Sequence, residues 1–178
     1  MNRLFPFYDL NKNFNVYNRV FNYVNTYLEN LPKMVNQTVI FDIDDTLVDT
    51  SRIIFQSDNI VLFDQIEPIV QLCKRCKQLG YKIIILTARY KEAIMSSIQN
   101  LNLFHIQYDE IYHNDNKEEP SFKIQFKKEL MRENNIVLCI GDQLTDIKGV
   151  DNSLGIKLPC KKNINAYFTY NNVNFYEI

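Results

Sequence analysis

Three short polar clusters carry the residues of this sequence whose types and spacing suit chemistry, and each follows an apolar run directly. The clusters are Asp42-Ile-Asp-Asp-Thr46, Thr87-Ala-Arg89 and Gly141-Asp-Gln-Leu-Thr-Asp146. The apolar runs are short and continuous, which predicts strands that are buried on both faces. Because ligands bind beyond the carboxyl ends of the strands in open α/β sheets, we expect the three clusters to meet at one site.

The acidic residues of these clusters suit a metal ion. Asp42 and Asp44 are two residues apart, so along an extended chain their carboxylates point to the same side. Like charges at this spacing repel, and a divalent cation relieves the repulsion; a ligand set made of oxygens favours a hard ion such as Mg²⁺. Asp142 supplies a third carboxylate and Asp146 a fourth. A single acidic cluster is normally a solvated turn, but four acids at two strand ends favour a metal site.

The elements that would position these clusters alternate between strand and helix. The expected strands are Thr38–Phe41, Tyr81–Leu86, Glu110–His113, Ile136–Ile140 and Leu154–Leu158. The expected helices between them are Pro68–Leu79, Tyr90–Asn100 and Ser121–Glu133. This alternation predicts a doubly wound α/β domain with a mainly parallel sheet and right-handed crossovers. The Asn-rich tail after Lys162 is compatible with an edge strand or with a loosely held end.

An amphipathic helix is expected ahead of the first strand, from about Asn13 to Asn30, and Pro32 ends it. Its polar face carries mainly Asn, whereas a helix on a membrane surface would carry Lys and Arg. The apolar stripe is therefore expected to pack on the domain that follows. The residues of that stripe are Phe14, Tyr17, Phe21, Val24, Leu28 and Leu31.

The composition excludes several classes of protein. The 178 residues are 46% hydrophobic and 23% charged, as in one folded domain. A net charge of −1 gives no overall field for nucleic acid or an anionic membrane, although a local basic groove would not appear in this sum. No apolar run is long enough to span a membrane and no secretion signal is evident, so we expect a cytoplasmic, reduced protein. Cys73 and Cys76 are interpreted as small core residues, because no second pair completes a zinc site.

Taken in order, the clusters resemble the motifs of the haloacid dehalogenase (HAD) superfamily over about residues 39–158. The matching residues are Asp42-x-Asp44-x-Thr46, Thr87, Lys123 and Gly141-Asp142-x-x-x-Asp146. The second Asp of the first motif marks the phosphatase and phosphotransferase branch. Phe122-Lys123 and the segment from Gly141 to Ile147 are further similar to the acid phosphatase group that includes the vegetative storage proteins.

The resemblance implies a HAD-like Rossmannoid three-layer α/β/α sandwich with an extra N-terminal helix. Residues 1–36 would be a helical extension packed on the core, and residues 37–178 a single catalytic domain. About 40 residues separate Thr46 from Thr87 and about 35 separate Thr87 from Lys123. These intervals leave room for a minimal cap only. Arg52, Phe55 and Phe63 would form a small flap over the site, unless the two aromatic residues belong to the core.

For the acidic residues, the resemblance implies both catalysis and metal binding. Asp42 would be the nucleophile that forms an aspartyl-phosphate, and Asp44 the general acid and then the base, oriented by Thr46. The metal, Mg²⁺, would be held by Asp42, by the backbone carbonyl of Asp44 and by Asp142. Asp146 would support Lys123 or a metal-bound water.

The remaining matched residues would bind the phosphate. Thr87 and the backbone N–H of Ala88 would hold phosphate oxygens at a helix N-terminus, where the helix dipole favours anions. Lys123 would neutralise the charge that develops in the reaction. Arg89 would either contact the substrate phosphate or pair with an acid.

The sequence thus predicts a Mg²⁺-dependent phosphatase that hydrolyses phosphomonoesters, with a phosphorylated small molecule or macromolecular end as its partner. A nucleotide or polynucleotide-end phosphatase is also compatible with the motifs, and it would need a basic strip beside the site. Lys117, Lys123, Lys127 and Lys128 are the candidates for this strip. The same motifs leave open phosphotransfer to an acceptor other than water, and a non-catalytic binding or storage protein on the same fold.

Overall fold

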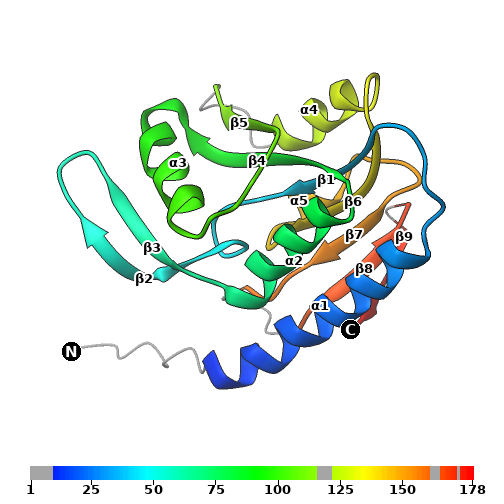
Figure 1. Cartoon of the computed structure of the whole chain (residues 1–178), viewed down its shortest axis with the longest axis horizontal. Coiled ribbons are helices and arrows are strands. Elements are labelled where there is room, and N and C mark those ends of the chain that lie inside the picture. Colours follow the sequence, from blue (N-terminus) through cyan, green and yellow to red (C-terminus); the bar gives the residue numbers. More distant parts are fainter. Residues whose placement is uncertain (1–9, 116–121, 161–164, 172) are drawn as a thin grey trace.

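A computed structural model describes residues 10–115, 122–160, 165–171 and 173–178. Within these ranges, seven strands form one sheet in the order β5-β4-β1-β6-β7-β8-β9 (Figure 1). The strands from β5 to β7 run parallel, and β8 and β9 are added in antiparallel fashion. The strand bounds are β1 Gln37–Phe41, β4 Lys82–Tyr90, β5 Glu110–Asn114, β6 Asn135–Gly141, β7 Leu154–Lys157, β8 Tyr167–Tyr170 and β9 Val173–Glu177.

Helices cover both faces of this sheet, which gives the three-layer α/β/α sandwich that the sequence predicts (Figure 1). The register places Ile40 opposite Ile84 and Cys139, and these three side chains pack beneath α4. Their neighbours along the strands point to the other face, beneath α1 and α2, because side chains alternate along a strand. The helices are α1 Leu10–Asn30, α2 Glu67–Gln78, α3 Ile94–Leu103, α4 Phe122–Leu130 and α5 Leu144–Ile147, with a 3₁₀ turn η1 at Lys91–Ala93.

The N-terminal helix α1 packs on the core, as its apolar stripe predicts. Val20, Val24 and Leu28 are fully buried, and the Tyr81 hydroxyl donates a hydrogen bond to the Leu28 carbonyl at 2.9 Å. The helix therefore joins the layer that α2 forms. In the described part of the chain, no helix is long and apolar enough to cross a membrane.

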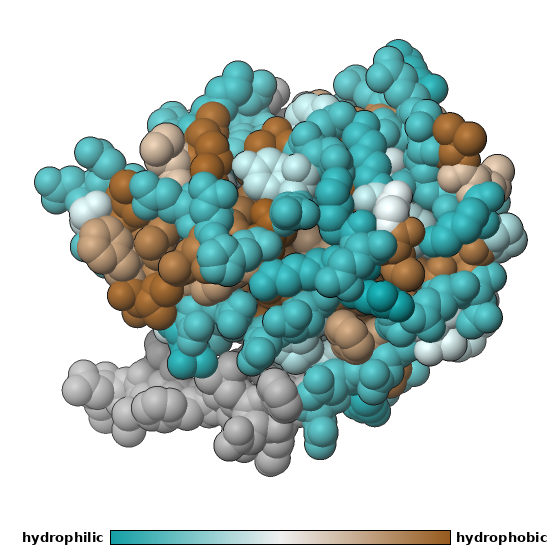
Figure 2. All heavy atoms as spheres, viewed as in Figure 1, coloured by the Kyte–Doolittle hydropathy of each residue, from teal (hydrophilic) through white to brown (hydrophobic). Residues whose placement is uncertain are grey.

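Strands also form in a hairpin that the sequence pattern did not reveal and in the Asn-rich tail. A hairpin of β2 (Val48–Gln56) and β3 (Val61–Gln65) projects from the body of the protein next to α3 (Figure 1). Apolar side chains gather over this hairpin (Figure 2), where Ile53, Ile54 and Phe55 are each more than half exposed. The Asn-rich tail forms β8 and β9, so of the two structures considered for the tail the edge strand is correct.

The ends of two elements also differ from the prediction. The expected cap of α4, Ser121, lies outside the described residues, and the helix ends at Leu130 because residues 131–133 form a turn. Strand β4 continues four residues beyond Leu86, to Tyr90, whose backbone is paired with Asn114 of β5. This extension changes the surroundings of Thr87.

Candidate active site

The three polar clusters meet at the carboxyl ends of β1 and of its two neighbours in the sheet, β4 and β6. The chain runs from β1 to β4 and β5 on one side of β1 and crosses back to β6 on its other side. Asp42 follows β1, Thr87 lies in the last part of β4, and Asp142 follows β6. The backbone N–H of Asp42 donates to the Ile140 carbonyl at 3.0 Å, which fixes the end of β1 against β6. Such a crossing point is where open α/β sheets bind ligands.

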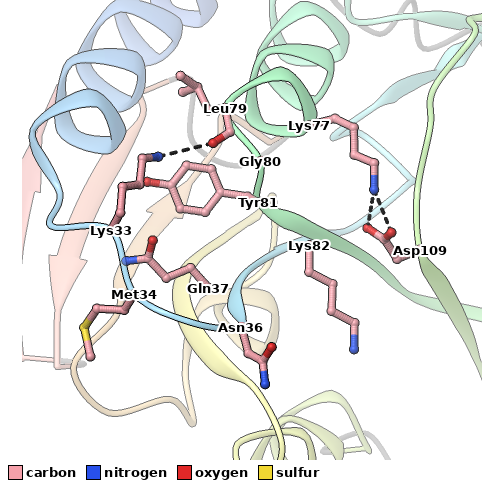
Figure 3. Close-up of a pocket in the computed structure, with 10 residues that line it drawn as sticks. All are labelled: Lys33, Met34, Asn36, Gln37, Lys77, Leu79, Gly80, Tyr81, Lys82 and Asp109. Atoms are coloured by element: carbon pink, nitrogen blue, oxygen red, sulfur yellow. Dashed lines mark hydrogen bonds and ion pairs between the residues drawn. The ribbon is translucent and has the colours of Figure 1, made fainter.

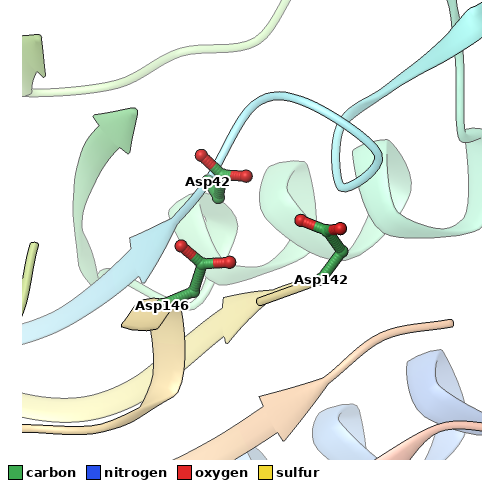
Figure 4. Close-up of side chains that lie close together, drawn as sticks. All are labelled: Asp42, Asp142 and Asp146. Carbon is green, nitrogen blue, oxygen red and sulfur yellow. The ribbon is translucent and has the colours of Figure 1, made fainter. Parts of the chain in front are cut away.

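Three carboxylates converge at this point. Oxygens of Asp42, Asp142 and Asp146 all lie within 4.8 Å of one another, and Figure 4 shows the side chains facing a common centre from β1, β6 and α5. Each of these residues is at most 5% exposed. The side chain of Asp146 lies directly over Gly141, where an added Cβ would collide with the Asp146 Cβ and carboxylate. Glycine at position 141 therefore allows α5 to bring Asp146 into the cluster.

Lys123 brings an ammonium group to the cluster. Its Nζ donates to Asp42 Oδ1 and to Asp146 Oδ1, each at 2.6 Å, and the residue is 5% exposed. Burial opposes the charged form of Lys123, but the two carboxylates outweigh burial and hold its pKa above the usual range. The structure thus brings Lys123 together with Asp42 and Asp146, and its role in catalysis stays a prediction.

The cluster holds more negative than positive charge. Burial raises the pKa of Asp42 to about 8, despite the opposing charge of Lys123. Burial, and next the charge of Asp146, raises the pKa of Asp142 to about 6. These shifts show that the metal-free site resists full ionisation. The donors are all carboxylate oxygens, so a hard divalent cation such as Mg²⁺ fits both the charge and the ligand type.

Asp44 does not join this cluster through its carboxylate. Its two oxygens accept three hydrogen bonds from the Arg89 guanidinium, the shortest from Nη2 at 2.6 Å. Arg89 also donates to Ser97 Oγ at 3.3 Å and lies 5.6 Å from the centre of the Phe63 ring. Of the two roles considered for Arg89, the structure shows the pairing with an acid.

The predicted phosphate-binding turn needs a correction. Thr87 and Ala88 do not lie at a helix N-terminus, because the chain stays extended to Tyr90 and α3 begins only at Ile94. Thr87 is buried, and its hydroxyl accepts the Arg89 backbone N–H at 3.2 Å, whereas Ala88 is exposed. Any binding of phosphate here would therefore use individual donors without the dipole of α3.

Two residues that follow Asp44 shape the turn into the hairpin. The Thr46 hydroxyl is buried and has no hydrogen-bond partner among the described residues, so its role in orienting Asp44 stays a prediction. Asp45 adopts a left-handed conformation with φ of 51° and accepts hydrogen bonds from the backbone N–H and the hydroxyl of Thr50. Asp tolerates this conformation better than most residues, which is the signal that the sequence offered for Asp45.

The structure brings one further lysine to the site. Lys127 is fully buried, and its Nζ donates to the backbone carbonyls of Thr145 and Asp146. Its place four residues after Lys123 puts both side chains on one face of α4. Of the four lysines considered for a basic strip, Lys123 and Lys127 thus point inward, Lys128 is exposed, and Lys117 lies outside the described residues.

The residues of the expected flap have clear positions. Phe55 is exposed, Phe63 packs partly against the core, and Arg52 pairs with Asp64 across the hairpin at 2.8 Å.

Cys73 and Cys76 are fully buried on α2 and belong to the main core, in agreement with their interpretation as core residues.

A second polar hollow of about 320 Å³ lies at the opposite, amino edge of the sheet (Figure 3). Lys77 donates to both oxygens of Asp109, at 2.6 and 2.7 Å. Lys33 donates to the Leu79 carbonyl at 3.3 Å and lies over the Tyr81 ring. The Lys33 contact holds the end of α2 against the loop before β1, and the Lys77 contact holds α2 against the residue that precedes β5. These contacts give the hollow a structural explanation.

The fold, with acids after β1 and β6 and a buried lysine brought to them by α4, defines a member of the haloacid dehalogenase superfamily. The model of its subfamily IIIB, the acid phosphatases, matches residues 62–176, and the chain belongs to this family. The matched range begins after Asp42, so the first motif lies outside it. Among curated proteins, none matches the chain.

Solved structures agree with this assignment at the level of the fold. The class C acid phosphatase from Bacillus anthracis is similar, with a TM-score of 0.62 and 17% identity over 76% of this chain and 65% of that chain. The same phosphatase with tungstate bound has a TM-score of 0.59 and 18% identity over 79% of this chain and 65% of that chain. This chain therefore spans just under two thirds of the phosphatase chains that it matches.

Proposed function

We propose that this protein is a Mg²⁺-dependent phosphatase that hydrolyses phosphomonoesters through an aspartyl-phosphate on Asp42. The observation that carries this proposal is the bridge from Lys123 to Asp42 and Asp146, beside the carboxylate of Asp142. This arrangement places the proposed nucleophile, Asp42, beside the buried ammonium of Lys123 and within the cluster of three carboxylates. Membership of the acid phosphatase family supports the same reaction class.

The carboxylates of Asp42, Asp142 and Asp146, with the backbone carbonyl of Asp44, are the groups that would hold Mg²⁺. The ion, when bound, would favour the ionised carboxylates and offset the negative charge of the phosphate. Lys123 contributes the same kind of stabilisation from the protein side, since its ammonium lies 2.6 Å from the proposed nucleophile.

The covalent step uses Asp42 and Asp44. A carboxylate oxygen of Asp42 attacks phosphorus, the bond from phosphorus to the ester oxygen breaks, and Asp44 gives its proton to that leaving oxygen. In the second step Asp44 takes a proton from a water molecule, whose oxygen attacks phosphorus. The bond between phosphorus and Asp42 then breaks and inorganic phosphate leaves.

Before that reaction, the phosphate must be held and Asp44 must be available. The Thr87 hydroxyl, the Ala88 backbone N–H and the Lys123 ammonium are the proposed donors to the phosphate oxygens. Arg89 engages the Asp44 carboxylate in the substrate-free protein. We infer that Arg89 turns partly toward the substrate phosphate when substrate binds, which frees Asp44 to carry a proton.

The insertion after the first motif is limited to the β2–β3 hairpin. Among the described residues, this hairpin is the insertion that borders the site, and such a small cap suits large or varied phosphoesters. The proposed substrate is therefore a phosphorylated small molecule or a phosphorylated macromolecular end. The leaving group is the part of the substrate that this geometry constrains least.

A screen of phosphomonoesters tests the proposal. It would compare sugar phosphates, nucleotides, phosphopeptides and 3′-phosphorylated oligonucleotides, with Mg²⁺ and after chelation. We expect release of inorganic phosphate that requires Mg²⁺ and is lost in Asp42→Asn. Release that persists after chelation, or in Asp42→Asn, would contradict the proposal, as would no turnover of any of these substrates by the Mg²⁺-loaded protein.

A further inference from the structure

Helix α4 sends two lysines to the same short segment, and the roles assigned above use only one of them. Lys123 reaches the carboxylate of Asp146, at 2.6 Å. Lys127, one turn later, reaches the backbone of that segment, with its Nζ 2.9 Å from the Thr145 carbonyl and 2.5 Å from the Asp146 carbonyl. Asp146 is therefore held by its side chain and by its main chain from a single helix.

A lysine that is fully buried must gain something specific, because removing an ammonium group from water is costly unless it is well hydrogen-bonded. The two carbonyls supply these bonds. They belong to α5, a helix of four residues (Leu144–Ile147), and the last carbonyls of any helix lack partners within the helix. Lys127 supplies hydrogen-bond donors to these carbonyls, in the segment that carries the Asp146 side chain.

The surrounding contacts restrict the same segment further. The backbone N–H of Gln143 donates to Asp146 Oδ2 at 2.8 Å, which closes the first turn of α5. Gly149 packs so closely against α4 that an added Cβ would lie 2.8 Å from the Ile124 side chain. Helix α4 thus contacts this segment through the hydrogen bonds of Lys123 and Lys127 and through the close packing of Ile124 on Gly149.

We propose that Lys127 is a positioning residue, which fixes the main chain at Thr145 and Asp146 so that the carboxylates of Asp42, Asp142 and Asp146 converge on one divalent cation. This inference rests on the proposed function for the identity of the cation. It assigns to Lys127 no contact with substrate or with the reacting atoms.

Three variants test this role. Lys127→Met keeps the length of the side chain and removes its donors, and Lys127→Arg keeps a charged donor. Lys128→Met is the matched control, because Lys128 is the next residue of the same helix and is exposed. The readouts are Mg²⁺ affinity by isothermal titration calorimetry, thermal unfolding without metal, and kcat and KM at saturating Mg²⁺.

We expect Lys127→Met to weaken Mg²⁺ binding about 10- to 100-fold, the usual effect of losing a group that orients a metal ligand. Lys127→Arg should recover part of the affinity, and Lys128→Met should match the wild type. Excess Mg²⁺ should restore most of the kcat of Lys127→Met, with little change in KM for substrate. If Lys127→Met does not fold, Lys127→Gln and Lys127→Arg carry the same comparison.

An unchanged Mg²⁺ affinity in folded Lys127 variants, with only a lower melting temperature, would overturn the proposal and leave Lys127 a purely structural residue. Failure of the wild type to bind Mg²⁺ would also overturn it. A wild type that binds Mg²⁺ through Lys127-dependent ligands but hydrolyses no phosphomonoester would overturn the proposed function and leave this inference standing.

Discussion

The two edges of the central sheet both bring lysines against carboxylates, but they do so in different surroundings. At the amino edge, the Lys77 and Asp109 side chains are 32% and 36% exposed, and each charge has one opposite partner (Figure 3). At the carboxyl edge, the Lys123 and Asp42 side chains are each 6% exposed. Three carboxylates converge there (Figure 4), and two of them, those of Asp42 and Asp146, contact the Lys123 ammonium.

This difference separates a structural ion pair from the cluster that is proposed to bind a metal ion. A partly exposed pair of this kind is solvated and contributes about 0–1 kcal/mol to stability. Buried carboxylates in excess of their cations are costly, and the raised pKa of Asp42 and Asp142 reflects that cost. A polar hollow is therefore a weaker sign of function than buried, unbalanced charge.

The largest expected effect comes from Asp42. Asp42→Asn should lower kcat by about four orders of magnitude or more, because the amide keeps the shape but cannot attack phosphorus. The corresponding change at the amino edge, Asp109→Asn, should leave kcat within about twofold of the wild type, since that carboxylate pairs only with structural groups. Steady-state rates of both variants at saturating Mg²⁺ check this contrast, and similar losses in the two would remove the distinction between the edges.

Asp44 should show a smaller and selective effect. Asp44→Asn should slow the hydrolysis of alkyl phosphates about 10²- to 10⁴-fold, because an alkoxide needs a proton to leave. An aryl phosphate with an acidic phenol should be affected much less, whereas Asp42→Asn should lose activity on every ester. Rates across a series of leaving groups, with bound Mg²⁺ measured in each variant, decide the matter. Equal losses across the series would show that Asp44 is not the acid.

Metal binding should depend on pH in a direction that follows from the carboxyl shifts. In the metal-free protein the pKa of Asp142 is raised to about 6, so the folded state keeps a proton that the unfolded chain releases. The free energy of unfolding should therefore fall as pH rises from about 4 to about 6. At a pH where the carboxylates are ionised, Mg²⁺ at about a hundredfold excess over its Kd should raise the free energy of unfolding by about 2.7 kcal/mol.

The difference in melting temperature with and without Mg²⁺ should accordingly grow from about pH 4 to about pH 8, because ligand carboxylates must lose their protons. Thermal unfolding across this range, with Ca²⁺ as a comparison ion, provides the measurement. A stabilisation that is the same at every pH would contradict the assignment of these carboxylates as ligands.

The smallest expected effect lies at the amino edge. Lys77→Met removes a partly exposed pair and should change the free energy of unfolding by no more than about 1 kcal/mol. Urea unfolding of this variant beside Lys123→Met makes the comparison of the edges quantitative. A large loss of stability in Lys77→Met would show that the amino-edge pair is not the weak solvated contact described here.

The features that the sequence predicted well depend on local pattern. Strand β1 was predicted within one residue, because its apolar run is continuous and ends abruptly in Asp42. Helix α2 ends within one residue of the predicted Leu79, and Gly80 follows it with φ of 87°, a conformation that glycine adopts without strain. The meeting of the acidic clusters followed from the rule that parallel strands present their carboxyl ends at one edge.

The features that the sequence missed depend on contacts between distant segments. Strand β4 continues through Thr87 because β5 pairs with Tyr90, and nothing local announces that pairing. The hairpin β2–β3 is anchored by α3, where Ser96 accepts the Val61 N–H and Asn100 donates to the Phe63 carbonyl. The spacing of four residues places Lys127 on the same face of α4 as Lys123, but only the tertiary structure brings the carbonyls of α5 against Lys127.

Above all, Asp42 is proposed to carry the phosphoryl group during turnover. The most direct test is rapid quenching of the Mg²⁺-loaded protein during hydrolysis, followed by borohydride reduction and peptide mass spectrometry. Borohydride reduces an aspartyl-phosphate to homoserine, so we predict homoserine at position 42 in the wild type and none in Asp42→Asn. A protein that turns over substrate but yields no homoserine at position 42, or yields it at another aspartate, would contradict the role proposed for Asp42.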